Sequence, residues 1–87
     1  MTNRSESFPV VVTSPDEVIW EGEAESVSSE NSAGAFDILP EHANFVTIIQ
    51  KGSPITVRTT DKKTMNFGYR NAVVAVKQGK VDIYADL

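Results

Sequence analysis

Cysteine is absent from this 87-residue chain, which excludes disulfide bonds, a thiolate nucleophile and a thiolate metal site. No apolar run approaches the roughly 20 residues that a membrane-spanning helix needs. Residues 1–7 also lack the apolar centre of a secretion signal. We therefore expect a soluble chain that is not secreted, does not insert into a membrane, and folds by packing alone.

Catalytic groups are equally scarce. His42 is the single histidine, and it follows Glu41 directly, so on an extended backbone the two side chains point to opposite sides. A histidine base normally works with a nucleophile and an orienting carboxylate, and that constellation is missing. The glycines are too scattered to form a phosphate-binding loop. The sequence predicts a non-catalytic protein without bound nucleotide, metal or other cofactor.

Length and composition predict one small folded domain. A chain of 87 residues lies near the lower size limit for a self-sufficient hydrophobic core. Its apolar content of 40% and charged content of 23% are ordinary for a globular protein. We expect a flexible polar tail over residues 1–7 and a single domain over residues 8–87.

Charge is distributed unevenly along the chain. Residues 1–41 carry nine acids against one arginine, whereas residues 42–87 carry seven bases against three acids, within a net charge of −4. Such a dipolar domain suits a protein partner of patterned charge. Nucleic acid is not expected as a partner, because aromatic residues are not interleaved among the bases.

Apolar residues recur with the two-residue period of strands, and no segment carries a helical repeat. Turn residues interrupt the pattern every 8 to 12 residues, as is typical of an all-β sandwich or small barrel. A tight turn is predicted at residues 77–80, with Gly79 at positive φ. The predicted strands cover residues 8–13, 18–29, 34–39, 45–49, 55–59, 65–69, 72–76 and 81–85.

One predicted strand carries a row of acids. Glu21, Glu23 and Glu25 alternate with small residues, so they should share one face of the strand. A solvated face explains the row most simply, and an acidic docking stripe is the functional alternative. The small residues expected on the other face are Gly22, Ala24 and Ser26.

The segment of residues 34–45 departs from plain alternation. Phe36, Ile38 and Leu39 are expected in the core, and Pro40 then removes an amide donor and ends the strand. This predicts a rigid corner that positions a partner rather than a substrate. The following strand, residues 45–49, is apolar on both sides, as expected where both faces are covered.

The same segment resembles a known family. Gly34, Phe36, Ile38-Leu39-Pro40, His42-Ala43 and Thr47 match the signature of the epsilon subunit of rotary ATP synthases, called delta in mitochondria. The likeness extends over residues 11–15, 20–23 and 80–86. It implies a two-sheet β-sandwich of about ten short, mainly antiparallel strands.

The resemblance also implies a function. Such a protein is a non-catalytic central-stalk rotor subunit of a proton- or sodium-translocating ATP synthase, bridging the gamma subunit and the c-ring. It would be peripheral to the membrane, on the cytoplasmic face in bacteria or on the organellar inner or thylakoid membrane in eukaryotes. Positions matching Thr13, His42 and Thr47 are implied to face gamma. The positions implied to approach the c-ring are Ser32, Ala33, Gly34, Ala35 and Phe36.

Some positions depart from the family pattern. Ala35 stands where an acid is common, so Glu30 or Asp37 is expected to supply any acidic contact with the c-ring. Asn44 replaces a usual proline. The sequence stops at residue 87, and without the family's C-terminal helical hairpin we expect no inhibitory arm. The alternative to the rotor subunit is a generic β-sandwich adaptor or carbohydrate-binding module.

Overall fold

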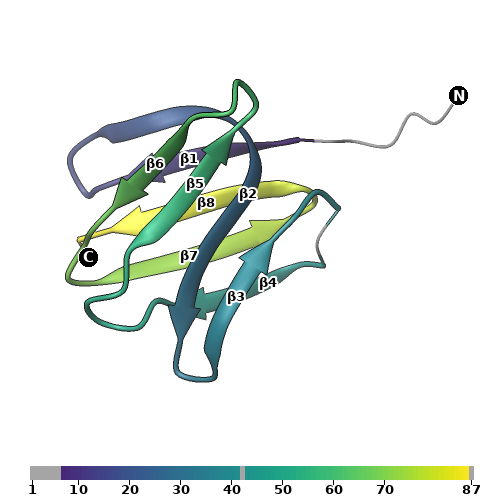
Figure 1. The fold of residues 1–87 in the computed structure, drawn as a ribbon. Coiled ribbons are helices and arrows are strands. Elements are labelled where there is room, and N and C mark those ends of the chain that lie inside the picture. Colours follow the sequence, from purple (N-terminus) through teal and green to yellow (C-terminus); the bar gives the residue numbers. More distant parts are fainter. Residues whose placement is uncertain (1–6, 42, 87) are drawn as a thin grey trace, which may run out of the picture.

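The computed structural model describes residues 7–41 and 43–86, and within these ranges every regular element is a strand (Figure 1). The absence of helix over this part of the chain confirms the all-β prediction. The strands are β1 (Phe8–Thr13), β2 (Val18–Asn31), β3 (Gly34–Ile38), β4 (Phe45–Ile48), β5 (Ile55–Thr59), β6 (Thr64–Phe67), β7 (Ala72–Lys77) and β8 (Lys80–Ala85).

The strands form a sandwich in which one long strand belongs to both layers. The hydrogen-bonded order is β4-β7-β8-β1-β2-β5-β6, with β3 paired to the second half of β2. The first half of β2 pairs with β1 and the second half with β5, so the sheet folds over itself along β2 (Figure 1). Over the described residues there are eight strands in one continuous sheet, rather than about ten in two separate sheets. Among these strands, only β1 and β8 pair in parallel.

A bulge in β2 changes which residues face the core. Opposite β5, the pairing steps from Ala24 to Ser26 while its partner moves by one residue, so Glu25 is extra. The predicted alternation is therefore wrong beyond Ala24, since Ser26 pairs with exposed Arg58 and Val27 becomes the next fully buried residue. The bulge also directs Glu25 to Lys62, whose Nζ lies 2.8 Å from its carboxylate.

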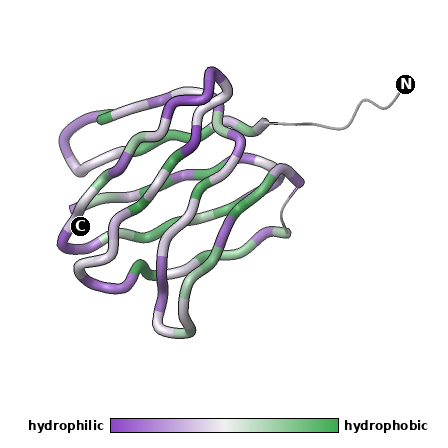
Figure 2. The backbone as a smooth tube through the Cα atoms, in the orientation of Figure 1, coloured by the Kyte–Doolittle hydropathy of each residue, from purple (hydrophilic) through white to green (hydrophobic). Residues whose placement is uncertain are grey.

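Aliphatic side chains from both layers form the core. β-branched residues dominate because they pack well on a pleated surface. Figure 2 shows hydrophilic residues gathered at the turns and hydrophobic ones along the central strands. The largest fully buried side chains are Ile38, Ile55, Ile83, Val10, Val12, Val27, Val57, Val74 and Val81.

The structure confirms the predicted β7–β8 turn and the predicted end of β3, but it places Leu39 outside the core. The β7–β8 turn forms as expected, with Gln78 and Gly79 both at positive φ, and Asn44 Oδ1 accepts the Gln78 amide at 2.8 Å. β3 ends at Ile38, before Pro40, as the sequence predicts. The prediction for Leu39 is wrong, because its side chain is 54% exposed beyond the end of the strand.

Candidate docking surfaces

The outer side of the β4-β7-β8-β1 layer is unusually apolar. Across it, Ile48 lies beside Val73 and Val73 beside Tyr84, while Val46 lies beside Ala75. Val46 and Ile48 are 69% and 72% exposed. The prediction that both faces of this strand are covered is therefore wrong, because β4 is an edge strand whose outer side is open to solvent. We define the apolar face as Val11, Thr13, Val46, Ile48, Val73, Ala75 and Tyr84. One half-buried acid, Asp82, lies on the same side between Ala75 and Val11, with its carboxylate 3.8 Å from Lys80 Nζ.

The outer side of the other layer has the opposite chemistry. Ser28 lies beside Thr56 and Thr56 beside Asn66, and these hydroxyl and amide groups bond to one another or to neighbouring strands. Arg58 and Thr64 form the next exposed pair. Exposed apolar surface is thus concentrated on one side of the sandwich, which is typical of a surface that another molecule covers.

The structure separates the residues that the resemblance assigns to the gamma interface. Thr13 lies on the apolar face, next to Tyr84. Thr47 lies on β4, separated from β1 by β7 and β8, a distance of about 14 Å at three strand spacings. The Thr47 side chain turns inward, in register with buried Val74. His42 lies outside the described residues.

The residues assigned to the c-ring lie together in and after the β2–β3 turn, at the lower end of the molecule in Figure 1. Ser32 and Ala33 are exposed at the tip, and Gly34 adopts φ 123°, a conformation that disfavours other residues. Ala35 is exposed, whereas Phe36 packs on the core and meets Phe45 edge-on, with ring centroids 6.1 Å apart. One aromatic ring therefore anchors the hairpin that carries the tip.

Asn31 connects this turn to β4, a role that the sequence reading missed. Its Oδ1 accepts the Ala33 amide at 2.9 Å, and its Nδ2 donates to Thr47 Oγ1 at 2.9 Å. The first bond is the local turn contact that asparagine commonly makes, which was readable from Asn31-Ser32-Ala33-Gly34. The second depends on a residue 16 positions away, so it required the fold.

An Asn31→Ala variant is expected to lose about 1–2 kcal/mol of unfolding free energy, because Ala33 and Thr47 each lose a hydrogen bond and the bond to Thr47 is partly buried. Amide exchange at Ala33 should accelerate in the same variant. Chemical denaturation and hydrogen exchange measure the two effects. Exposed Ser32→Ala serves as the control and should change stability by less than about 0.5 kcal/mol. Equal behaviour of the two variants would contradict this role of Asn31.

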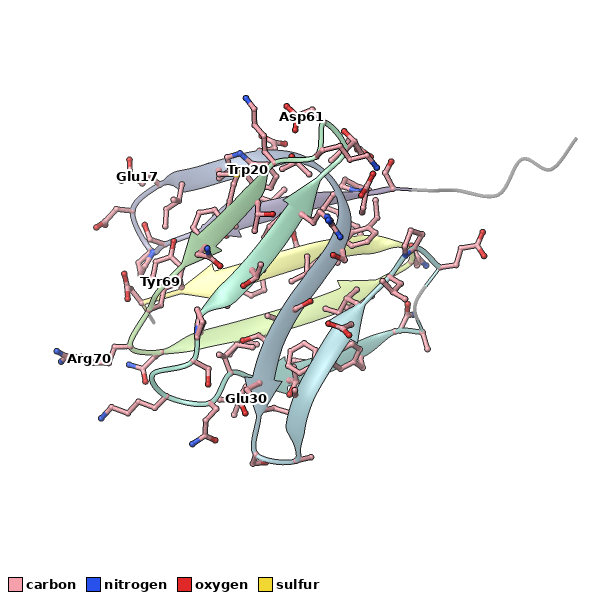
Figure 3. All side chains as sticks on the ribbon, viewed as in Figure 1. Glu17, Trp20, Glu30, Asp61, Tyr69 and Arg70 are labelled. Atoms are coloured by element: carbon pink, nitrogen blue, oxygen red, sulfur yellow. The ribbon has the colours of Figure 1, made fainter. Side chains whose placement is uncertain are left out.

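Both acids proposed to replace the missing carboxylate at Ala35 have local partners. Glu30 Oε1 accepts the Ser53 hydroxyl at 2.8 Å, and Asp37 Oδ1 accepts the Ser28 hydroxyl at 2.5 Å. Both acids remain exposed. Glu30 lies at the same end of the molecule as the turn (Figure 3), so it is the better placed of the two.

Trp20, Phe67 and Tyr69 pack against the core rather than in an exposed row. Trp20 contacts Phe67 at a centroid distance of 6.3 Å, and Phe67 stacks on Tyr69 at 6.2 Å. Burial, and to a lesser extent the charge of Asp86, raises the pKa of the Tyr69 phenol above its ordinary value of 10.0. All three rings are at least half-covered, so they do not form the exposed platform that sugars stack on.

Within residues 7–41 and 43–86, no three acidic or histidine side chains gather as a metal site would require. The described part of the chain also contains no helix long and apolar enough to cross a membrane.

The described residues form a β-sandwich with one apolar face and one anchored turn. These features define a docking domain.

The chain belongs to the delta/epsilon family of ATP synthase subunits. Residues 7–87 match the family model described as "ATP synthase, Delta/Epsilon chain, beta-sandwich domain". The resemblance seen in the sequence is thereby confirmed.

Individual relatives agree with this membership. The chain is similar to the ATP synthase epsilon chain of Helicobacter pylori (32% identity over 80 residues, 88% of this chain and 61% of that one). It is also similar to those of Brevibacillus brevis (30%, 88% and 58%) and Corynebacterium efficiens (26%, 88% and 62%). The chain spans about three fifths of the length of these relatives.

Two solved assemblies contain the same fold. A chain of the Euglena gracilis mitochondrial ATP synthase, described as OSCP/F1/c-ring, matches with a TM-score of 0.84 at 20% identity, covering 97% of this chain and 53% of that one. A chain of the Tetrahymena thermophila central stalk and c-ring matches with a TM-score of 0.77 at 13% identity, covering 97% and 66%. At these identities the matches establish the fold.

Proposed function

We propose that this chain is a non-catalytic rotor subunit that bridges the gamma subunit and the c-ring of a rotary ATP synthase. Family membership supports the proposal. The similar Tetrahymena thermophila structure, which is described as a central stalk and c-ring, also supports it. The observation that carries it is the apolar face, which is ready-made for a partner of matching shape. The subunit would lie at the membrane periphery, held by its partners.

In this proposal, gamma covers the apolar face. Val46 and Ile48 supply exposed apolar area on the edge strand β4, Tyr84 supplies it on β8, and Thr13 lies beside Tyr84 on β1. Thr47 supports β4 from behind through its bond to Asn31, while the backbone and flanking side chains of the strand make the contact. His42 is retained as a proposed gamma contact on the resemblance alone.

The c-ring meets the β2–β3 turn in the same proposal. Ser32, Ala33 and Ala35 present a small, nearly uncharged tip, with Gly34 shaping it and Phe36 holding it to the core. Exposed Glu30 is the nearest acid on the same hairpin and would contact basic groups of the ring. Because the turn and β4 are joined through Asn31, force applied at the tip reaches the gamma-facing strand directly.

Reconstitution tests the proposal. The chain is mixed with the gamma subunit of the same organism, with and without the c-ring, and analysed by size-exclusion chromatography. A stoichiometric complex with gamma, retained when the c-ring is added, is the expected result. Failure to form any complex with gamma would contradict the rotor assignment. Unchanged migration with gamma but retention on a glycan array would instead support the carbohydrate-binding alternative.

A further inference from the structure

The first half of β2 has one unpaired edge. Between Val18 and Glu23, β2 pairs with β1 on one side, while β5 joins its other side only from Ala24 onward. Among the described residues, no strand pairs with this six-residue edge. Half of its amide and carbonyl groups therefore point toward solvent, which is the arrangement that an added strand uses.

This edge has only some of the protections that usually prevent strand addition, namely a bulge at Ile19 and the charged side chains of Glu21 and Glu23. Residues 18–23 contain no lysine or proline, and Val18 and Ile19 are 54% and 39% exposed. Proteins commonly blunt such an edge with one of those residues. The edge is thus both open and partly apolar.

A cavity lies beside the same edge. It measures about 540 Å³ and lies between β2 and the β5–β6 turn. Figure 3 shows Trp20 and Asp61 together at this end of the molecule, and both line the cavity. Its apolar part consists of the Trp20 ring and Met65. The rest of the wall is polar and includes Glu23 of β2 together with Thr59, Thr60 and Lys63.

Gly22 allows the Trp20 ring to form this wall. A Cβ at position 22 would lie 2.7 Å from the ring atom Cζ2, which is closer than real contacts allow. The ring therefore lies flat against the strand, and the space above it stays open. The part of the wall that Trp20 forms therefore depends on two residues of one strand.

Carboxylates surround the edge and the cavity. Glu21 and Glu23 lie on the outer side of β2, in register with Val11 and Pro9, and both are exposed. Asp61 lies across the cavity, where the Thr59 hydroxyl, and secondarily Lys63, lowers the pKa of its carboxyl. Ser7 Oγ donates to Glu23 at 2.9 Å, which leaves the second carboxylate oxygen of Glu23 without a bond to a described residue.

We propose that the edge of β2 at residues 18–23 accepts an extended, basic segment of a partner protein as an additional β-strand. Side chains of an added strand alternate between the two sides of the sheet. Those on the outer side would lie opposite Glu21 and Glu23 and are lysine or arginine. Those on the inner side would enter the cavity beside Trp20 and are apolar. This interaction is independent of the docking of gamma on the apolar face.

A second copy of this chain fits the edge less well than a basic strand does. In pairings of β2 with β2 that bring Glu21 or Glu23 of the two copies opposite one another, the like charges are destabilising. The acids therefore disfavour such pairing and favour a basic strand.

The test uses a synthetic octapeptide of alternating lysine and valine. Trp20 is the sole tryptophan and lines the cavity, so its fluorescence reports occupancy directly. We expect a saturable change in emission, together with slower amide exchange over residues 18–23. An octapeptide of alternating glutamate and valine should produce neither effect. Absence of binding by the lysine–valine peptide would overturn the proposal.

A second peptide separates strand addition from simple charge attraction. An N-methylated lysine–valine octapeptide keeps every charge but loses the backbone donors that face β2, so it should not bind. Equal binding of the methylated and unmethylated peptides to the unsubstituted chain would overturn the proposal. This comparison needs no protein variant and so does not depend on any variant folding.

Charge reversal on the protein completes the test. In Glu21→Lys/Glu23→Lys, two attractive cross-strand pairs become repulsive, so affinity should fall about tenfold or more. Glu30→Lys/Asp37→Lys makes the same change in net charge away from this edge and should bind the peptide with unchanged affinity. Equal losses in the two double variants would overturn the assignment to β2.

Discussion

An Ile48→Lys variant is expected to bind gamma about 30-fold more weakly than the unsubstituted chain, a loss of about 2 kcal/mol. In the proposed complex, Ile48 lies within the apolar face beside Val73, so a lysine there would lose its hydration against apolar surface. Stability should not change, because the side chain is 72% exposed and β4 is an edge strand. Calorimetric titration with purified gamma measures the effect.

Thr64→Lys is the matched control. Thr64 is exposed on β6, on the polar outer side of the other layer, and the substitution adds the same charge. Its affinity for gamma should stay within about twofold of the original, because surface changes outside an interface are nearly neutral. If Thr64→Lys weakened binding as much as Ile48→Lys, a general charge effect would replace docking on the apolar face.

The second large effect concerns the core. Ile83→Ala should cost about 2–5 kcal/mol of unfolding free energy, through lost burial and the cavity left behind. Ile83 is fully buried and lies between Val12 on β1 and Val74 on β7, so the remaining neighbours are fixed by pairing on both sides. For a domain of this size, the melting temperature should fall by at least about 10 °C. Thermal unfolding followed by circular dichroism measures the shift.

Ile48→Ala is the matched control for Ile83→Ala. It removes the same atoms from an exposed position on the apolar face, so it should change stability by less than about 0.5 kcal/mol. The same variant should nevertheless weaken gamma binding. A melting temperature as low as that of Ile83→Ala would show that the apolar face contributes to the fold rather than to docking.

Local sequence rules sufficed for most of the strands and for the tightest turn. The β7–β8 reversal needed only Gln78-Gly79, because two residues at positive φ match the twist of a hairpin. Pro40 correctly marked the end of β3. These features depend on neighbours in the chain, which is why they were predictable.

Features that depend on distant partners were not predictable. The bulge at Glu25 arises where β2 leaves β1 and joins β5, and alternation alone gave no sign of it. Val46 and Ile48 predicted a strand covered on both faces, because they are apolar. A sequence pattern shows which side chains are apolar, but it does not show which part of the protein, or which partner, covers them. The structure leaves them open, which indicates a partner as that cover.

The candidate docking surfaces show the same difference between features set by neighbours in the chain and features set by distant partners. The composition of the β2–β3 turn and the anchoring ring of Phe36 were visible in the sequence. The bond from Asn31 to Thr47 and the unpaired edge of β2 depend on which strands become neighbours. Sequence spacing cannot supply that information for a single chain.

Hydroxyl-radical footprinting of the chain, alone and bound to gamma, shows whether the apolar face is where gamma docks. We expect gamma to protect Val46, Ile48 and Tyr84 from oxidation, while Met65 and Phe67 in the other layer keep their rates. If Val46, Ile48 and Tyr84 react as fast in the complex as in the free chain, gamma does not dock on the apolar face.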